Sequence, residues 1–211
     1  MKRFLLFCLS ATLVASFSIS VSAQGKNEAA KLTKEGSEAL KRKDYDKAVE
    51  AYQKAAELDH RNDKGYSLAL QQRAYALTAQ QKFQQAIEDY NSALEITPDD
   101  QGIYERRAYA EMRLGDYNHA LTDYNEMLKR KPNDVSYLLY RSYIYEVKGD
   151  IANSMADCDK VLQMHPNAQQ SQEVKARKER LTKIQQNQLP AGPITPPPKQ
   201  SASPATQPKK P

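Results

Sequence analysis

The stretch that decides the fold is Leu70–Asp100, LQQRAYALTAQQKFQQAIEDYNSALEITPDD. Moved forward by 34 residues it overlies YERRAYAEMRLGDYNHALTDYNEMLKRKPND, and moved forward again by 34 it overlies LLYRSYIYEVKGDIANSMADCDKVLQMHPNA. A looser copy, LTKEGSEALKRKDYDKAVEAYQKAAELDHRN, lies 38 residues before the first stretch. A fixed period of this length indicates repeated units, each of which buries its apolar face against its neighbours.

Each copy has the pattern of two helices joined by a short turn. Leu70, Ala74 and Leu77 recur at helical spacing before the turn, and Phe83 opens a second run with the same spacing after it. A proline, which cannot continue a helix, follows the second run in three copies, at Pro98, Pro132 and Pro166. The four extra residues of the first copy fall in the segment 60–67 between two units, where added length costs little loop-closure entropy.

The repeats resemble the tetratricopeptide repeat (TPR) family. Three positions carry this resemblance: a small residue early in the first helix, a small residue where the second helix crosses it, and an aromatic or aliphatic residue that opens the second helix. They are Gly36, Ala74, Ala108 and Ser142; Ala48, Ala86, Ala120 and Ser154; and Tyr45, Phe83, Tyr117 and Ile151. The resemblance implies an all-α fold, a right-handed α-solenoid of four helix-turn-helix units with a C-terminal capping helix.

We expect four segments along the chain. Residues 1–23 are a signal peptide, and residues 24–166 are the TPR array, with repeats at about 29–62, 67–100, 101–134 and 135–168. Residues 167–188 have a narrow apolar stripe on an otherwise polar helix, as a terminal cap requires. Residues 189–211 are rich in proline and lysine with little apolar bulk, which predicts a disordered tail.

The first 23 residues predict export. A basic pair, Lys2 and Arg3, precedes an apolar run that ends in Val21-Ser22-Ala23, a small-residue cleavage site. We expect a periplasmic protein of a bacterium that is not integral to a membrane after cleavage. A secreted protein, or one tethered by an uncleaved signal, is the alternative.

Composition and motifs argue against several classes of function. The net charge of +5 is too small to indicate a nucleic-acid partner. The three histidines share no spacing with carboxylates that would suggest a metal site, and no phosphate-binding glycine loop or nucleophile motif occurs. We therefore predict no catalytic residues, no cofactor and no metal. Cys158, the one cysteine beyond the signal segment, occupies the place of Tyr90 and Tyr124 on the helix face expected to be buried, so it is expected in the core rather than as an intermolecular or redox thiol.

Two polar features recur with the repeat. Arg73, Arg107 and Arg141 are each followed 16 residues later by an aspartate, at Asp89, Asp123 and Asp157. Both partners are missing together in the first copy. This pattern predicts an arginine–aspartate link between the two helices of a unit, or between adjacent units, and a structural role for it.

The second recurring feature is a tyrosine two residues after each arginine, at Tyr75, Tyr109 and Tyr143. By resemblance, the first helices of a TPR array line its concave groove, and tyrosine is favoured at protein interfaces. The residues expected to line the groove are Gln71, Tyr75, Glu105, Tyr109, Met112, Arg113, Leu139, Tyr143 and Glu146. Packing of the tyrosines between repeats is the alternative, because a single sequence does not determine how the helices are rotated.

The sequence therefore predicts a non-catalytic scaffold that binds a peptide or a partner protein. The alternative is a structural spacer or assembly subunit of a cell-envelope complex, which would contact cell wall or membrane through the basic, proline-rich tail. Deleting residues 189–211 separates the two, because only the second function depends on the tail.

Overall fold

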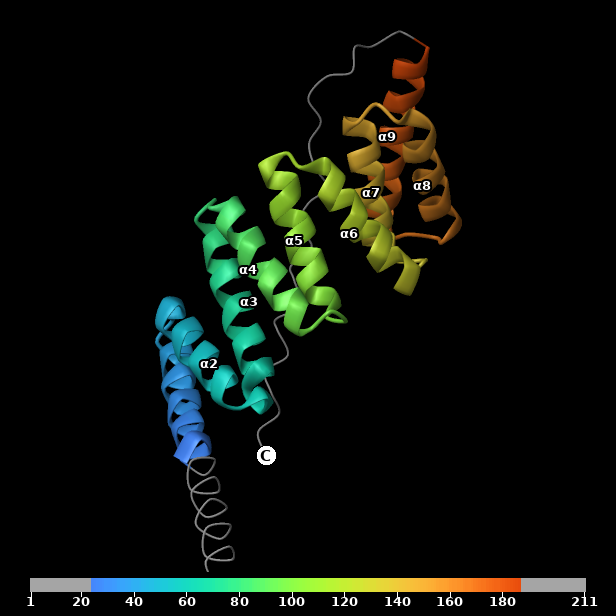
Figure 1. Cartoon of the computed structure of the whole chain (residues 1–211). Coiled ribbons are helices and arrows are strands. Elements are labelled where there is room, and N and C mark those ends of the chain that lie inside the picture. Colours follow the sequence, from blue (N-terminus) through green and yellow to red (C-terminus); the bar gives the residue numbers. More distant parts are fainter. Residues whose placement is uncertain (1–23, 187–211) are drawn as a thin grey trace, which may run out of the picture. The chain divides into compact units, whose positions relative to one another are not determined.

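The computed structural model describes residues 24–186, and within that range every regular element is a helix (Figure 1). A first helix covers 24–41 of the described residues. It is followed by α2 (Tyr45–Leu58), the 3₁₀ helix η1 (His60–Asn62), α3 (Asp63–Ala79), α4 (Phe83–Ile96), α5 (Gln101–Leu114), α6 (Tyr117–Arg130), α7 (Val135–Val147), α8 (Ile151–Gln163) and α9 (Ala168–Gln185). The predicted all-α repeat fold is confirmed. The predicted signal peptide and tail lie outside the described residues.

The second helix of each repeat begins at the residue that the repeat pattern indicates, at Tyr45, Phe83, Tyr117 and Ile151. In the last two repeats an aspartate caps this helix. The Asp116 carboxylate accepts from the backbone N–H of His119 at 3.2 Å, and Asp150 accepts from that of Asn153 at 3.2 Å. Each bond satisfies a backbone donor that has no partner inside the helix.

The turn inside each hairpin has the same backbone conformation in all four repeats. One residue in each turn has a positive φ: Lys43 (60°), Gln81 (62°), Gly115 (90°) and Gly149 (77°). Only glycine adopts this region without a steric cost. The first two repeats therefore make the same turn with a less favourable residue.

The extra four residues of the first repeat are ordered as η1 and the start of α3. The Asn62 side chain holds this segment: its Nδ2 donates to the carbonyl oxygens of Ala55 and Asp59 at 3.2 and 2.9 Å. Its Oδ1 accepts from the Thr33 hydroxyl on the first helix at 2.8 Å. The insertion thus forms hydrogen bonds on both sides and is not a loose connection.

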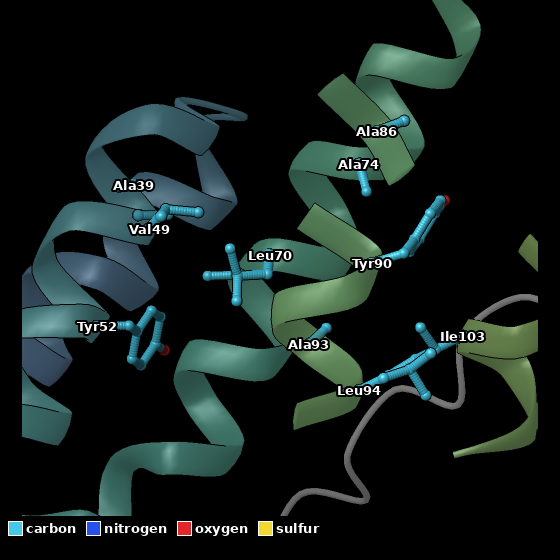
Figure 2. Close-up of a cluster of buried hydrophobic side chains, with 12 residues drawn as sticks. Ala39, Val49, Tyr52, Leu70, Ala74, Ala86, Tyr90, Ala93, Leu94 and Ile103 are labelled. Atoms are coloured by element: carbon cyan, nitrogen blue, oxygen red, sulfur yellow. The ribbon is translucent and has the colours of Figure 1, made fainter. Parts of the chain in front are cut away.

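The chain forms two compact units, one up to Arg106 and the other from Arg107, and α5 contributes to both. In the first unit, α3 and α4 pack closely because Ala74 and Ala86 lie where they cross, both fully buried (Figure 2). The core around this crossing consists of Ala39, Ala48, Val49, Tyr52, Ala69, Leu70, Ala74, Ala86, Tyr90, Ala93, Leu94 and Ile103.

Two glycines make room for the Tyr52 ring in the first unit. A Cβ atom built on Gly36 of the first helix would lie 2.7 Å from the ring, and one built on Gly65 of α3 would lie 2.6 Å from it. Figure 2 shows the ring directed from α2 toward the start of α3. The absence of side chains at Gly36 and Gly65 is what lets three helices close on one aromatic ring.

The core of the second unit is built mainly from α7. The rings of Tyr124 and Tyr140 stack with centroids 5.4 Å apart, and Leu138 and Ile144 are fully buried. Cys158 is also fully buried and lies 3.2 Å from the Ser142 hydroxyl. As predicted from its place in the repeat, this cysteine belongs to the core.

Candidate functional site

The three recurrent arginines and aspartates come together as bidentate ion pairs within each hairpin. Arg73 on α3 donates its Nε and Nη2 to the two carboxylate oxygens of Asp89 on α4, at 2.8 and 2.7 Å. The same geometry recurs twice, at 2.9 and 2.6 Å for Arg107 with Asp123 and at 2.8 and 2.7 Å for Arg141 with Asp157. Such two-point pairing specifies orientation as well as contact.

Arg73 and Arg141 also contact the preceding repeat. The Nη1 of Arg73 donates to Asp46 on α2 at 3.2 Å, and the Nη1 of Arg141 donates to Asn125 on α6 at 2.9 Å. One guanidinium therefore joins the helices of its own hairpin and links that hairpin to its neighbour. Burial raises the pKa of Asp123 despite the opposing effect of Arg107, which shows how strongly this carboxylate is desolvated.

The first tyrosine of the predicted ladder is the one most exposed to solvent. Tyr75 on α3 is 49% exposed, and Leu68, two turns earlier, is an exposed large apolar residue too. Residues seven apart share a helix face, and Gln71 and Gln72 lie between them on that face. We call Leu68, Gln71, Gln72 and Tyr75 the α3 face.

The polar end of the α3 face is ordered by hydrogen bonds to the start of α5. Gln71 donates its Nε2 to Asp100 and accepts from Nη1 of Arg106, each at 3.4 Å. Asp100 in turn accepts from the backbone N–H of Gly102 at 2.9 Å. Glu105, also expected in the groove, is partly buried on the same turn of α5.

The second tyrosine of the ladder pairs with an arginine on its own helix. Arg113 donates its Nη1 to the Tyr109 hydroxyl at 2.9 Å, and its guanidinium carbon lies 5.9 Å from the ring centroid. Tyr109 is partly buried and Arg113 exposed, whereas Met112, expected in the groove, is buried. In the second unit α5 thus presents an aromatic ring and a cation together.

The structure places the last third of the predicted groove beneath α9, which the sequence analysis did not anticipate. Leu139, Tyr143 and Glu146 are 4%, 5% and 3% exposed. Arg177 of α9 donates to the carbonyl oxygen of Leu139 at 3.0 Å, and its guanidinium carbon lies 5.9 Å from the Tyr143 ring centroid. Burial is the main cause that raises the pKa of Tyr143, to about 12.

Glu146 is the electrostatic anchor of α9. Arg180 donates Nε and Nη2 to its two oxygens at 2.7 and 2.8 Å, and Nε of the buried Arg177 lies 3.7 Å away. Glu146, which the sequence analysis expected to line the groove, can therefore contact a partner only if α9 leaves first. Sequence reasoning missed this because Arg177 and Arg180 lie outside the repeat period and so have no counterparts to compare.

No cluster among residues 24–186 has the composition of a metal site. His119 pairs with Asp116 at 2.6 Å on the surface, and this contact raises the pKa of the imidazole. His60 lies 3.5 Å from Asp63, also at the surface. Within the same range, no helix combines the length and the apolar character needed to cross a bilayer.

Known proteins resemble this chain in both repeat pattern and fold. A TPR repeat model matches residues 74–115, and two tetratricopeptide repeat models match residues 105–169 and 32–62. No curated protein matches the chain significantly.

Several solved structures share the fold. A tetratricopeptide repeat protein from Parabacteroides merdae has a TM-score of 0.60 at 23% identity, over 77% of this chain and 63% of that one, which is less than two thirds of its length. YrrB, described as a TPR protein with an unusual peptide-binding site, has a TM-score of 0.59 at 13% identity, over 80% of this chain and 84% of its own. MamA from Desulfovibrio magneticus has a TM-score of 0.56 at 15% identity, over 76% and 86%.

The matched repeat models and the shared fold agree with the fixed period of the chain. The protein belongs to the tetratricopeptide repeat family.

Proposed function

We propose that this chain is a non-catalytic scaffold that binds a peptide or a segment of a partner protein on the α3 face. The exposure of Tyr75 is the observation that carries the proposal. A tyrosine ring is large, rigid and amphipathic, and here it stands on a helix whose opposite side is fixed in the core by Leu70 and Ala74. YrrB, which shares the fold, is described as having a peptide-binding site, and this supports the same class of function here.

The chemistry of the α3 face favours a partner segment with apolar and amide groups over one with a run of like charges. Leu68 and Tyr75 provide apolar contact area, and Gln71 and Gln72 provide side-chain donors and acceptors between them. Arg106 and Asp100, which hold Gln71, bring one charge of each sign to its edge.

Selection of phage-displayed random peptides on the immobilised protein tests this proposal. Enriched peptides are expected to bind Tyr75→Ala at least about tenfold more weakly, because a central tyrosine at an interface contributes about 2 kcal/mol. Leu58→Ala is the matched control, since Leu58 has nearly the same exposure as Tyr75 but lies at the end of a second helix. Equal binding to wild type and Tyr75→Ala would refute the proposal.

We also propose that the protein is exported to a bacterial periplasm. The basic start, the apolar run and the small residues at Val21-Ser22-Ala23 support this. Expression of the full chain in a bacterium, followed by osmotic shock and intact mass measurement, is expected to yield a periplasmic protein beginning at Gln24. A full-length product retained in the membrane fraction would support the tethered alternative instead.

A further inference from the structure

Glu111 on α5 is a buried carboxyl group at a position where the other repeats have no charge. The corresponding residues are Ala39, Leu77 and Tyr145. Glu111 is nevertheless only 4% exposed. Glutamate is seldom buried without a partner, because transfer of its charge out of water is costly.

The contacts of Glu111 do not compensate for this burial. Its Oε2 is buried and has no hydrogen-bond partner. Its Oε1 lies 3.7 Å from Nε of Arg107, too far for a hydrogen bond. Arg107 directs that same Nε, together with Nη2, to Asp123 at 2.9 and 2.6 Å. Arg107, the cation in a salt bridge with Glu111, is therefore already engaged by another carboxylate.

The charged groups that act on Glu111 come from both helices of the hairpin. Arg107 lies one turn before it on α5, Asp123 and His119 are on α6, and Asp116 is at the N-terminus of α6. Burial, reinforced by the negative charge of Asp123, raises the pKa of Glu111 to about 8, and Arg107 and His119 only partly oppose this.

We propose that Glu111 is a pH-responsive element of the α5–α6 hairpin, which accommodates the neutral carboxyl group and opens more readily when that group ionises. The unpaired Oε2 and the prior engagement of Arg107 by Asp123 are the geometric basis. The neutral carboxyl group carries no charge into the core. The ionised carboxylate carries a full negative charge, and no donor forms a hydrogen bond with its buried Oε2.

The direction of the effect follows from linkage. The pKa of Glu111 in the folded hairpin is about 8, above its ordinary value of 4.5. The unfolded hairpin therefore releases this proton at lower pH than the folded one. The contribution of Glu111 to the stability of the hairpin is therefore greatest at acid pH and falls as the pH rises toward 8, by up to about tenfold in the equilibrium constant per pH unit.

Hydrogen exchange of the full chain, followed by mass spectrometry from pH 5.5 to 8.5, tests the proposal. After correction for intrinsic exchange rates, protection of α5–α6 peptides is expected to fall several-fold per pH unit. Glu111→Gln, which keeps the shape and removes the ionisation, is expected to abolish that decline. The α3–α4 hairpin, with Leu77 at the corresponding position, is the internal control and keeps its protection.

Two further variants separate Glu111 from other titrating groups. Glu179→Gln removes an equivalent charge from an exposed site on α9, and His119→Gln removes the imidazole whose pKa is raised by its hydrogen bond to Asp116. Both are expected to keep the decline of wild type. The same decline in Glu111→Gln as in wild type, or its loss in His119→Gln, would overturn the proposal.

Direct titration of wild type keeps the proposal testable if Glu111→Gln does not fold. The side-chain carboxyl carbon of Glu111, assigned by NMR in ¹³C-labelled protein, is expected to titrate with a midpoint above pH 7. A midpoint near the ordinary value for glutamate would overturn the proposal, whatever the behaviour of the variants.

Discussion

At the scale of single residues, Asp123 is the most consequential carboxylate of the repeat. Its side chain is only 2% exposed, and its two oxygens receive the two-point hydrogen bond from Arg107. A buried carboxylate that loses its cation keeps the cost of desolvation without the compensating attraction.

We therefore expect Arg107→Ala to lower the free energy of unfolding by about 3 kcal/mol. Urea unfolding followed by circular dichroism measures this. Arg113→Ala removes an exposed arginine from the same helix and is expected to cost much less. If both variants unfold at the midpoint of wild type, the Arg107–Asp123 pair has no stabilising role.

The backbone of the hairpin turn predicts a stabilising substitution. Gln81 has a φ of 62°, whereas Gly115 and Gly149 occupy the same position of later repeats. Gln81→Gly removes the steric cost of this conformation, but it also gives the unfolded chain more conformational freedom. Because the first effect is the larger, we expect the free energy of unfolding to rise by about 0.5–1 kcal/mol.

The reciprocal variant checks this reading of the turn. A Cβ at Gly115 meets no atom within 4 Å, so any loss in Gly115→Ala comes from the backbone alone. We expect a loss of about 1 kcal/mol in a thermal melt. Destabilisation by Gln81→Gly would show that its side chain contributes more than the turn costs.

Residue-scale prediction from the sequence succeeded where the repeat supplied several examples. The arginine–aspartate spacing of 16 recurs three times, and the structure brings all three pairs together. Glu111 has no equivalent in the other copies, and its burial depends on a helix rotation that one sequence leaves open. Its environment became apparent only from the packing of α5 against α6.

At the scale of elements, the first unit depends on how closely three helices approach Tyr52. Alanine at Gly36 or Gly65 would bring a methyl group within 2.8 Å of the ring. Alanine improves helix propensity by about 1 kcal/mol, but overpacking costs about 1–3 kcal/mol. The two effects oppose each other, and the contact with the ring is the larger.

We therefore expect Gly36→Ala and Gly65→Ala to be net destabilising by about 1 kcal/mol. Thermal melts measure this, with Gly25→Ala as the control because nothing lies within 4 Å of a Cβ there. A gain in stability for Gly36→Ala would mean that the Tyr52 ring moves aside at little cost.

Docking of α9 depends on one carboxylate. Glu146→Ala would leave the guanidinium of Arg177 buried with a weaker set of acceptors, and would release Arg180. We expect α9 to lose protection in hydrogen exchange at least about tenfold, since breaking a buried pair costs on the order of 3 kcal/mol. Unchanged protection of α9 would show that Val174 and Leu181 suffice to hold it.

Because α9 docks on the second unit, the residues predicted to line the groove differ in exposure between the two units. Tyr75 and Tyr143 are equivalent in the repeat, yet one is largely exposed and the other is covered by α9. Periodicity assigned both to one face of a first helix. It could not show which face α9 would cover, because that depends on residues outside the period.

At the scale of the whole molecule, stability is built from contacts between consecutive helices. α3 packs extensively against α4, α7 against α8, and α2 against α3. A fold of this kind has no single core, so a local change is felt mainly by adjacent elements. The fold class could be predicted from the sequence because the same helical pattern recurs in four copies, although each copy is imperfect.

The exposed hairpin turn at Gln80–Lys82 has a practical consequence. The backbone N–H of Lys82 donates to the carbonyl oxygen of Leu77 at 2.9 Å, and this bond joins the two helices at the turn. The turn itself contributes no side chain to the core. A foreign segment spliced between Gln80 and Gln81 would therefore extend into solvent without entering the helix packing. This makes the turn a suitable place for an epitope or fluorophore with which to trace the protein in cells.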